Sequence, residues 1–141
     1  HSERYRSAGV RIDASLADST PRVLVDPERI QEVLGGLLDN ALRCTPAGGT
    51  VTVVGRPSAS GDGAVITVTD TGVGLTPTET GQIFRRFAKA ADSPGSGLGL
   101  TIARAIVEAH HGTLTADSDG PGTGACFTIT LPASGSRPTA R

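Results

Sequence analysis

The chain has 141 residues, the usual length of one compact domain. Its hydrophobic fraction of 37% and its 19 glycines are typical of a globular protein with a packed core, not of a disordered chain. Thirteen Lys and Arg residues against fourteen Asp and Glu residues give a net charge of -1, which argues against nucleic-acid binding and against membrane contact by this fragment.

The first elements expected are two short strands and a long helix. Apolar residues alternate with polar ones at residues 10–12 and 23–25, which predicts the strands. Asp26 suits the cap of a helix and Pro27 its first position. The apolar face of this helix repeats at helical spacing through Ile30, Val33, Leu34, Leu37, Leu38 and Ala41.

A Thr, Pro and Gly cluster at residues 45–49 ends the helix, and two strands are expected around residues 51–53 and 65–68. The polar residues 57–63 between them predict a hairpin. These strands extend the sheet that the first two begin.

A long, Gly-, Pro- and Thr-rich loop is expected at residues 71–99, with at most one short helix inside it. A second helix follows at about residues 97–110 and stops at Gly112. Leu114 and the alternating apolar residues 127–131 predict the last two strands. Amphipathic helices need a surface to cover, so the order of elements indicates an α/β two-layer sandwich with a mixed sheet covered on one face.

Asp70 follows the apolar strand directly and opens the sequence DTGVG, in which Gly72 and Gly74 permit tight turns. A carboxylate at a strand end is well placed to bind a ligand. Alone, the motif is more typical of an ordinary turn in which Asp bonds its own backbone than of a binding site.

Three glycines precede the second helix in GSGLGL, residues 95–100. Backbone N–H groups and the helix dipole there would favour a bound phosphate. The spacing fits neither the dinucleotide motif nor the P-loop, and a flexible hinge is the alternative.

Asn40 and Arg43 lie three residues apart on the first helix, hence on the same side. Asn is unfavourable inside a helix, and its amide oxygen suits Mg²⁺ that is shared with phosphates, whose charge Arg43 could balance. The alternative is an exposed Asn-Arg pair. In residues 84–87, FRRF, two aromatic residues are more typical of a loop anchor than of a binding site.

Together these segments resemble the ATP-binding catalytic domain of bacterial sensor histidine kinases, in the superfamily of DNA gyrase, the Hsp90 chaperones and MutL. QEVLGGLLDNALRCTP resembles the asparagine box, DTGVG the first glycine box, IFRRF the phenylalanine box and GSGLGL the second glycine box. The resemblance covers residues 10–132. It implies the Bergerat-type fold, a mixed, mostly antiparallel sheet with about three helices on one face.

The resemblance also implies a role for each matching residue. Asn40 would hold Mg²⁺, Arg43 would approach the phosphates of ATP, and Asp70 would accept a hydrogen bond from the amino group of adenine. Gly72 and Gly74 would admit the base. The second glycine box would close over the triphosphate through Gly95, Ser96, Gly97, Leu98 and Gly99.

Gly36 departs from the family pattern. It stands one helical turn before Asn40, where the kinases have Asn or His and the ATPases have a general-base Glu. Without a carboxylate at this position, efficient ATP hydrolysis is disfavoured, whereas a histidine acceptor needs no base on this domain. The family's acceptor motif is absent from the sequence, and His110 and His111 do not match it.

The function implied is transfer of the γ-phosphate of Mg-ATP to a histidine on a separate dimerisation domain, in the same or another polypeptide, with a response regulator downstream. The alternatives are a serine kinase of the anti-sigma-factor type and a nucleotide-binding module without transfer. The expected organisation is a lead-in at residues 1–9, the catalytic domain at 10–132 with an ATP lid at 76–96, and a disordered tail at 133–141.

The fragment is expected to be cytoplasmic, since it has neither an apolar run long enough to cross a bilayer nor the apolar core of a signal peptide. A membrane anchor elsewhere in the parent protein is compatible with this. The first residue is His1, so upstream sequence is expected to be missing. Cys44 and Cys126 are too few for a disulfide framework and are expected to be reduced.

Overall fold

The computed structural model of the protein describes residues 2–17, 27–59, 63–82 and 96–132. The strand expected at residues 23–25, the FRRF segment and the tail lie outside them. The helices are α1 (Ser2–Ala8), α2 (Pro27–Cys44), α3 (Pro77–Gln82) and α4 (Ser96–Ala109). The strands are β1 (Arg11–Leu16), β2 (Thr50–Pro57), β3 (Gly63–Asp70), β4 (Thr113–Asp117) and β5 (Ala125–Pro132).

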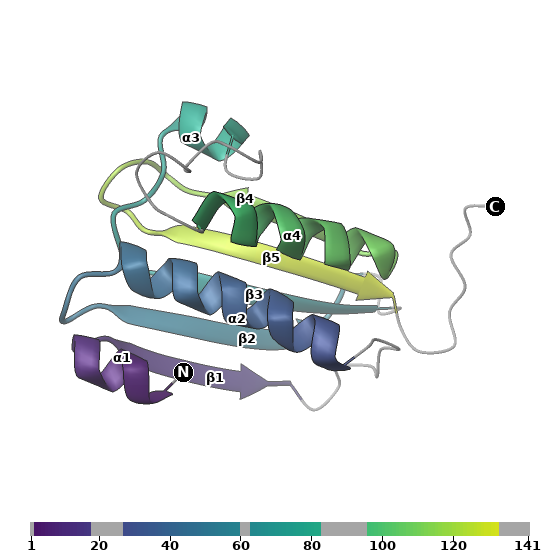
Figure 1. Ribbon diagram of the computed structural model, residues 1–141, viewed down its shortest axis with the longest axis horizontal. Helices are drawn as coiled ribbons and strands as arrows, with labels where there is room; N and C mark the ends of the chain where they lie inside the picture. The colour runs from purple at the N-terminus through teal and green to yellow at the C-terminus, as the bar shows by residue number, and fades with distance from the viewer. Residues whose placement is uncertain (1, 18–26, 60–62, 83–95, 133–141) are drawn as a thin grey trace.

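The described strands form one sheet in the order β1-β2-β3-β5-β4. β1 pairs with β2 in parallel, and every other neighbouring pair is antiparallel. Helices α2 and α4 lie side by side on one face of this sheet, and α1 lies next to β1 (Figure 1). The predicted mixed, mostly antiparallel sheet with helices on one face is confirmed.

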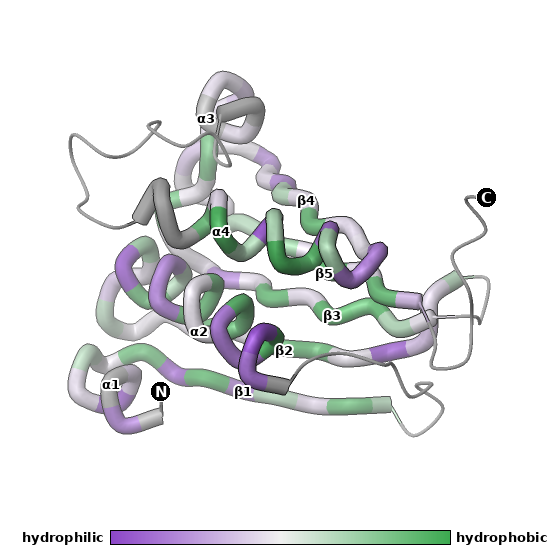
Figure 2. The backbone as a smooth tube through the Cα atoms, turned by 45° about the vertical axis from the view of Figure 1, so that its right-hand side comes forward, coloured by the Kyte–Doolittle hydropathy of each residue, from purple (hydrophilic) through white to green (hydrophobic). Residues whose placement is uncertain are grey.

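The core lies between the sheet and the pair formed by α2 and α4. Residues of α2 at helical spacing, Val33, Leu37 and Ala41, are buried as predicted. Hydrophobic and hydrophilic segments alternate along α2 in Figure 2, as in a helix with one buried side. The strands contribute alternate residues to the same core, for example Phe127 and Ile129 of β5. None of the helices in the described part has the length and apolar character of a membrane span.

Helix α4 ends at Ala109, and the residue that leaves the helix with a left-handed backbone is His111, with φ of 67°. The N–H of Gly112 bonds the carbonyl oxygen of Val107 at 3.0 Å. A Cβ atom at Gly112 would overlap the carbonyl oxygen of Thr130. Gly112 therefore serves the close approach of the chain to β5, while His111 makes the turn.

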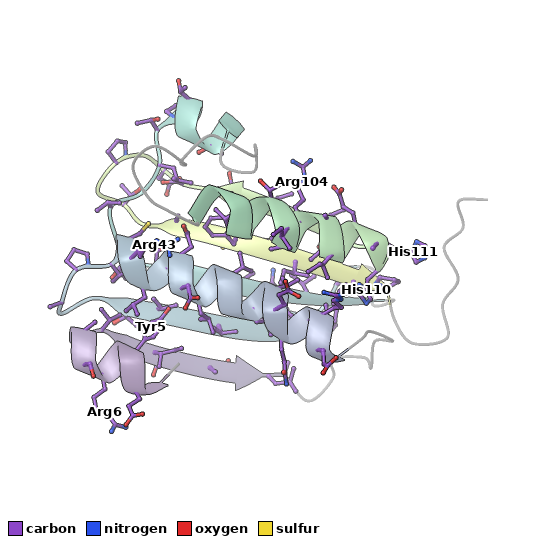
Figure 3. The ribbon with its side chains drawn as sticks, in the orientation of Figure 1. Tyr5, Arg6, Arg43, Arg104, His110 and His111 are labelled. Atoms are coloured by element: carbon purple, nitrogen blue, oxygen red, sulfur yellow. The ribbon has the colours of Figure 1, made fainter. Side chains whose placement is uncertain are left out.

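The lead-in segment contains a helix that the sequence did not predict. Tyr5 of α1 is fully buried, and its hydroxyl donates a hydrogen bond of 2.6 Å to the carbonyl oxygen of Leu38 in α2. In Figure 3, Tyr5 lies between the two helices. A buried aromatic side chain with a satisfied hydroxyl is a strong anchor, so α1 is packed onto the domain.

Candidate functional site

Asp70 is the last residue of β3, where β3 is flanked by β2 and β5. The residue is only 4% exposed. Its Oδ1 accepts hydrogen bonds from the N–H groups of Gly72 at 2.9 Å and Ala125 at 3.2 Å. The first is the local turn bond that the sequence allowed as an alternative, whereas the second comes from a neighbouring strand and fixes the carboxylate in the sheet.

The other carboxylate oxygen of Asp70, Oδ2, has no hydrogen-bond donor among the described residues. Burial raises the pKa of Asp70 above the usual value of 3.8, and the N–H groups of Gly72 and Ala125 act in the opposite direction. An acceptor kept from water without a partner costs free energy unless a ligand supplies the donor. Asp70 thus offers one oxygen to a ligand with an N–H group.

Asn40 is a second buried polar group that has no hydrogen-bond partner in the described part of the chain. It lies on α2 between the buried Leu37 and Ala41, and it is 8% exposed. Its side-chain amide has no hydrogen bond to any other described residue. The alternative of an exposed Asn-Arg pair is excluded by this burial, and the amide is available to a ligand or metal ion.

Arg43 differs from Asn40 in its surroundings, although the sequence predicted one common side. Its side chain is exposed at the carboxyl-terminal end of α2 (Figure 3). Residues three apart in a helix are separated by roughly 60° around the axis, enough for one to be buried and the other exposed. Arg43 therefore lies on the surface at the end of α2, next to the buried Asn40 but not buried with it.

The end of α2 is joined to the segment after Asp70 by the backbone. The N–H of Val73 donates to the carbonyl oxygen of Cys44 at 3.0 Å. At Gly72, a Cβ atom would overlap that same oxygen, so the glycine allows the two segments to touch. Gly74 has φ of 73°, and a Cβ there would overlap the carbonyl oxygen of Gly120. What the structure shows at both glycines is close contact with the protein's own backbone.

The ends of three elements meet at one end of the molecule. Figure 1 shows the last turn of α2, the end of β3 and the first turn of α4 together at that end. The predicted second helix is confirmed and begins at Ser96. Gly95 lies outside the described residues, and Ser96, Gly97, Leu98 and Gly99 form the first turn of α4. The first N–H groups of a helix have no partner within it, so this turn can receive an anion.

A cavity of about 350 Å³ lies beside Asp70. It is lined by residues of β3, β4, β5 and the connection between the last two strands, and Asn40 does not line it. The Cys44–Val73 hydrogen bond joins the end of the helix that carries Asn40 to the segment that follows Asp70. Most of the expected lid, residues 83–95, is outside the described part.

The residues present fit a metal ion only in company with a ligand. In residues 2–17, 27–59, 63–82 and 96–132, no group of three or more His, Cys, Asp or Glu side chains could hold a metal. The buried amide of Asn40 offers one hard oxygen ligand. An ion such as Mg²⁺ would therefore need further oxygens from a phosphate or from water.

Comparison with known proteins identifies the family. The family model for histidine kinase-, DNA gyrase B- and HSP90-like ATPases matches residues 25–135. The chain belongs to this ATPase family. Within the family it is of the sensor-histidine-kinase type, which confirms the resemblance drawn from the four motifs.

Individual relatives agree. The chain is 35% identical over 133 residues to the adaptive-response sensory kinase SasA of Trichormus variabilis, covering 92% of this chain and 33% of the relative. The mycobacterial sensor histidine kinase MprB is 32% identical with a TM-score of 0.78, covering 92% and 89% of the two chains. Full-length ShkA, solved in complex with AMPPNP, has 28% identity and a TM-score of 0.81, covering 93% and 27%. The chain spans about a third or less of the length of the curated relatives it matches, from 34% down to 14%.

The sequence analysis missed the contribution of the β4–β5 connection. It predicted the last two strands but assigned the segment between them no part in the site. The structure brings the N–H of Ala125 onto Asp70 and the backbone of Gly122 and Gly124 onto residues 72 and 73. The signal that could have revealed it is the run of closely spaced glycines in DGPGTG, residues 119–124, far more than a simple hairpin requires.

We predict that Asp70→Asn raises the free energy of unfolding of the nucleotide-free domain at about pH 7. The pKa of Asp70 is raised on folding, so the folded state binds more protons than the unfolded state between pH 3.8 and the pKa of the folded state. The free energy of unfolding therefore falls as the pH rises through this range. The amide of Asn keeps an acceptor for Gly72 and Ala125 without the buried charge. Urea unfolding at neutral and acidic pH measures the difference, which should shrink on acidification.

The control is Asp117→Asn, since Asp117 is exposed at the end of β4. This variant should match the wild type at both pH values. An Asp70→Asn domain that is less stable than the wild type at neutral pH would contradict the assignment of a costly buried charge.

Proposed function

We propose that this domain binds Mg-ATP at the end of β3 and presents the γ-phosphate to a histidine on a separate dimerisation domain. The observation that carries the proposal is a pair of buried polar groups that have no partner among the described residues, Oδ2 of Asp70 and the amide of Asn40. They lie on β3 and α2, whose ends are together with the first turn of α4 (Figure 1). Family membership supports nucleotide binding, as does the AMPPNP complex of ShkA.

Asp70 selects the base. Its Oδ2 accepts a hydrogen bond from the exocyclic amino group of adenine, while Gly72 and Ala125 hold Oδ1. Guanine carries a carbonyl oxygen at the same place, which leaves two acceptors facing each other. The unpaired carboxylate then costs about 1–3 kcal/mol or more, a discrimination of about fivefold and upwards.

Asn40 and Arg43 act on the triphosphate end. The amide oxygen of Asn40 is a ligand for Mg²⁺, which supplies charge neutralisation to the phosphates when it is bound. Arg43, exposed at the end of the same helix, adds positive charge at the rim. The second glycine box lies against the phosphates with its backbone N–H groups, through Gly95, Ser96, Gly97, Leu98 and Gly99.

The phosphoryl acceptor lies outside this chain in our proposal. His110 and His111 lie at the opposite end of α4 from Arg43 in Figure 3. Gly36 offers no general base for hydrolysis. The relatives SasA and TorS are named as sensory kinase and sensor protein, and this chain covers only 33% and 14% of their lengths, which leaves room for an acceptor domain. A response regulator then takes the phosphoryl group, and this domain contributes by positioning and charge.

Asp70→Asn should lower the affinity for AMPPNP at least about tenfold, because the amide presents a donor where the adenine amino group needs an acceptor. Affinity for the guanine analogue GMPPNP should rise or stay the same. Isothermal calorimetry measures both, with Asp13→Asn as the control that keeps wild-type affinities, because Asp13 lies on the edge strand β1 and does not line the cavity beside Asp70. Undiminished AMPPNP binding by Asp70→Asn would refute the adenine contact.

Asn40→Ala should remove most of the increase in AMPPNP affinity that Mg²⁺ produces, because the buried oxygen ligand is gone. Affinity without Mg²⁺ should change by less than about threefold. Asn40→Asp keeps an oxygen ligand and is the matched control, with its Mg²⁺ dependence retained. If Asn40→Ala shows the same Mg²⁺ dependence as the wild type, Asn40 is not the metal ligand.

Transfer is tested by incubating the domain and radiolabelled ATP with a helical-hairpin domain that bears the acceptor histidine, from the parent protein or a related sensor kinase. We expect acid-labile phosphohistidine on the hairpin and no label on this chain alone. Acid-stable phosphoserine on a regulatory protein would favour a serine kinase. Nucleotide binding with no transfer to any acceptor would indicate a binding module in which Gly36 marks lost catalysis.

A further inference from the structure

The connection between β4 and β5 packs against the segment that follows Asp70. Residues 118–124 are called the glycine turn and residues 71–75 the Asp70 loop. The N–H of Gly122 donates to the carbonyl oxygen of Val73 at 2.7 Å, and the N–H of Gly124 donates to that of Gly72 at 3.1 Å. The two segments are therefore held together by their backbones, with no charged group between these atoms.

In the described part of the chain, Ser118 is the one residue of the glycine turn whose side chain forms a hydrogen bond with the Asp70 loop. Its Oγ accepts from the N–H of Leu75 at 3.0 Å and from the N–H of Gly120 at 3.1 Å. The hydroxyl donates to the carbonyl oxygen of Gly124 at 2.7 Å. One hydroxyl thus ties together the two ends of the glycine turn and the end of the Asp70 loop.

These bonds lead to both donors that hold Asp70. Gly124, which accepts from Ser118, directly precedes Ala125, whose N–H donates to Oδ1 of Asp70. Gly72, the second residue of the Asp70 loop, supplies the other N–H that donates to Oδ1. Because the orientation of a carboxylate follows the donors on one of its oxygens, the position of Oδ2 depends on this arrangement.

We propose that Ser118 is a positioning residue that sets the direction of Oδ2 of Asp70 and thereby the selectivity for adenine over guanine. The proposal rests on the proposed nucleotide site. Ser118 acts by keeping the glycine turn and the Asp70 loop in register. An error of a few tenths of an ångström in a buried acceptor is enough to weaken recognition of a single amino group.

The test is the ratio of AMPPNP to GMPPNP affinity in Ser118→Ala, measured by calorimetry. We expect AMPPNP affinity to fall about tenfold and GMPPNP affinity to stay within about twofold, so that the ratio falls about tenfold. Ser118→Thr keeps the hydroxyl and should restore the ratio. The amide of Ala125 should exchange with solvent about tenfold faster in Ser118→Ala.

Thr113→Val is the control. Thr113 is exposed at the start of β4, the strand end that lies away from the glycine turn, and it does not line the cavity beside Asp70. This variant should keep the wild-type affinity ratio. Equal losses of the ratio in Ser118→Ala and Thr113→Val, or an unchanged ratio in Ser118→Ala, would overturn the proposal.

Two other results, misfolding of Ser118→Ala and a wild-type domain without adenine preference, can each be told apart from failure of the proposal about Ser118. If Ser118→Ala does not unfold cooperatively, Ser118→Cys, a similar volume with weak hydrogen bonding, replaces it under the same expectations. A wild-type domain that does not prefer AMPPNP to GMPPNP contradicts the proposed function and the selectivity role together. The exchange rate of the Ala125 amide then still shows whether Ser118 holds that amide in place, since this measurement needs no nucleotide.

Discussion

The site depends on a carboxylate that is buried and only half satisfied. Asp70 is 4% exposed, and two backbone N–H groups hold its Oδ1 while Oδ2 has no donor among the described residues. Such a group opposes folding, because burial disfavours its charged form and leaves an acceptor without water. In the proposed function, a ligand brings the missing donor, which accounts for such a residue at the end of a central strand. Stability and binding are therefore opposed at this one residue.

The surroundings of Asp70 are built from backbone, not from side chains. Cys44 at the end of α2, the Asp70 loop and the glycine turn are joined by N–H to carbonyl hydrogen bonds. Contacts of this closeness leave no room for a Cβ, which gives Gly72 and Gly74 a packing reason that holds before any nucleotide is considered. Backbone hydrogen bonds of this kind hold Asp70 in place without requiring particular side chains at the surrounding non-glycine positions. Ser118 is the hydroxyl that completes it.

Local sequence patterns predicted the helices and strands, but they did not predict contacts between residues that are far apart in the sequence. The 3.6-residue repeat of α2 and the alternation in β3 and β5 were sufficient, since both report which side of an element is buried. Asp70 was found because it ends such a strand. The helix that contains Tyr5 was not predicted, because one aromatic residue among polar residues forms no hydrophobic repeat. Spacing placed Asn40 and Arg43 on one side, and tertiary packing separated them. Ser118 has partners 43 residues away, and no local pattern encodes them.

A crystal structure of the domain with AMPPNP and Mg²⁺ tests the central claim most directly. The account predicts that the exocyclic amino nitrogen of adenine lies within hydrogen-bonding distance of Oδ2 of Asp70. It also predicts that the amide oxygen of Asn40 lies about 2.1 Å from the metal ion. A nucleotide bound elsewhere, or bound here with Oδ2 facing no donor, would contradict the account.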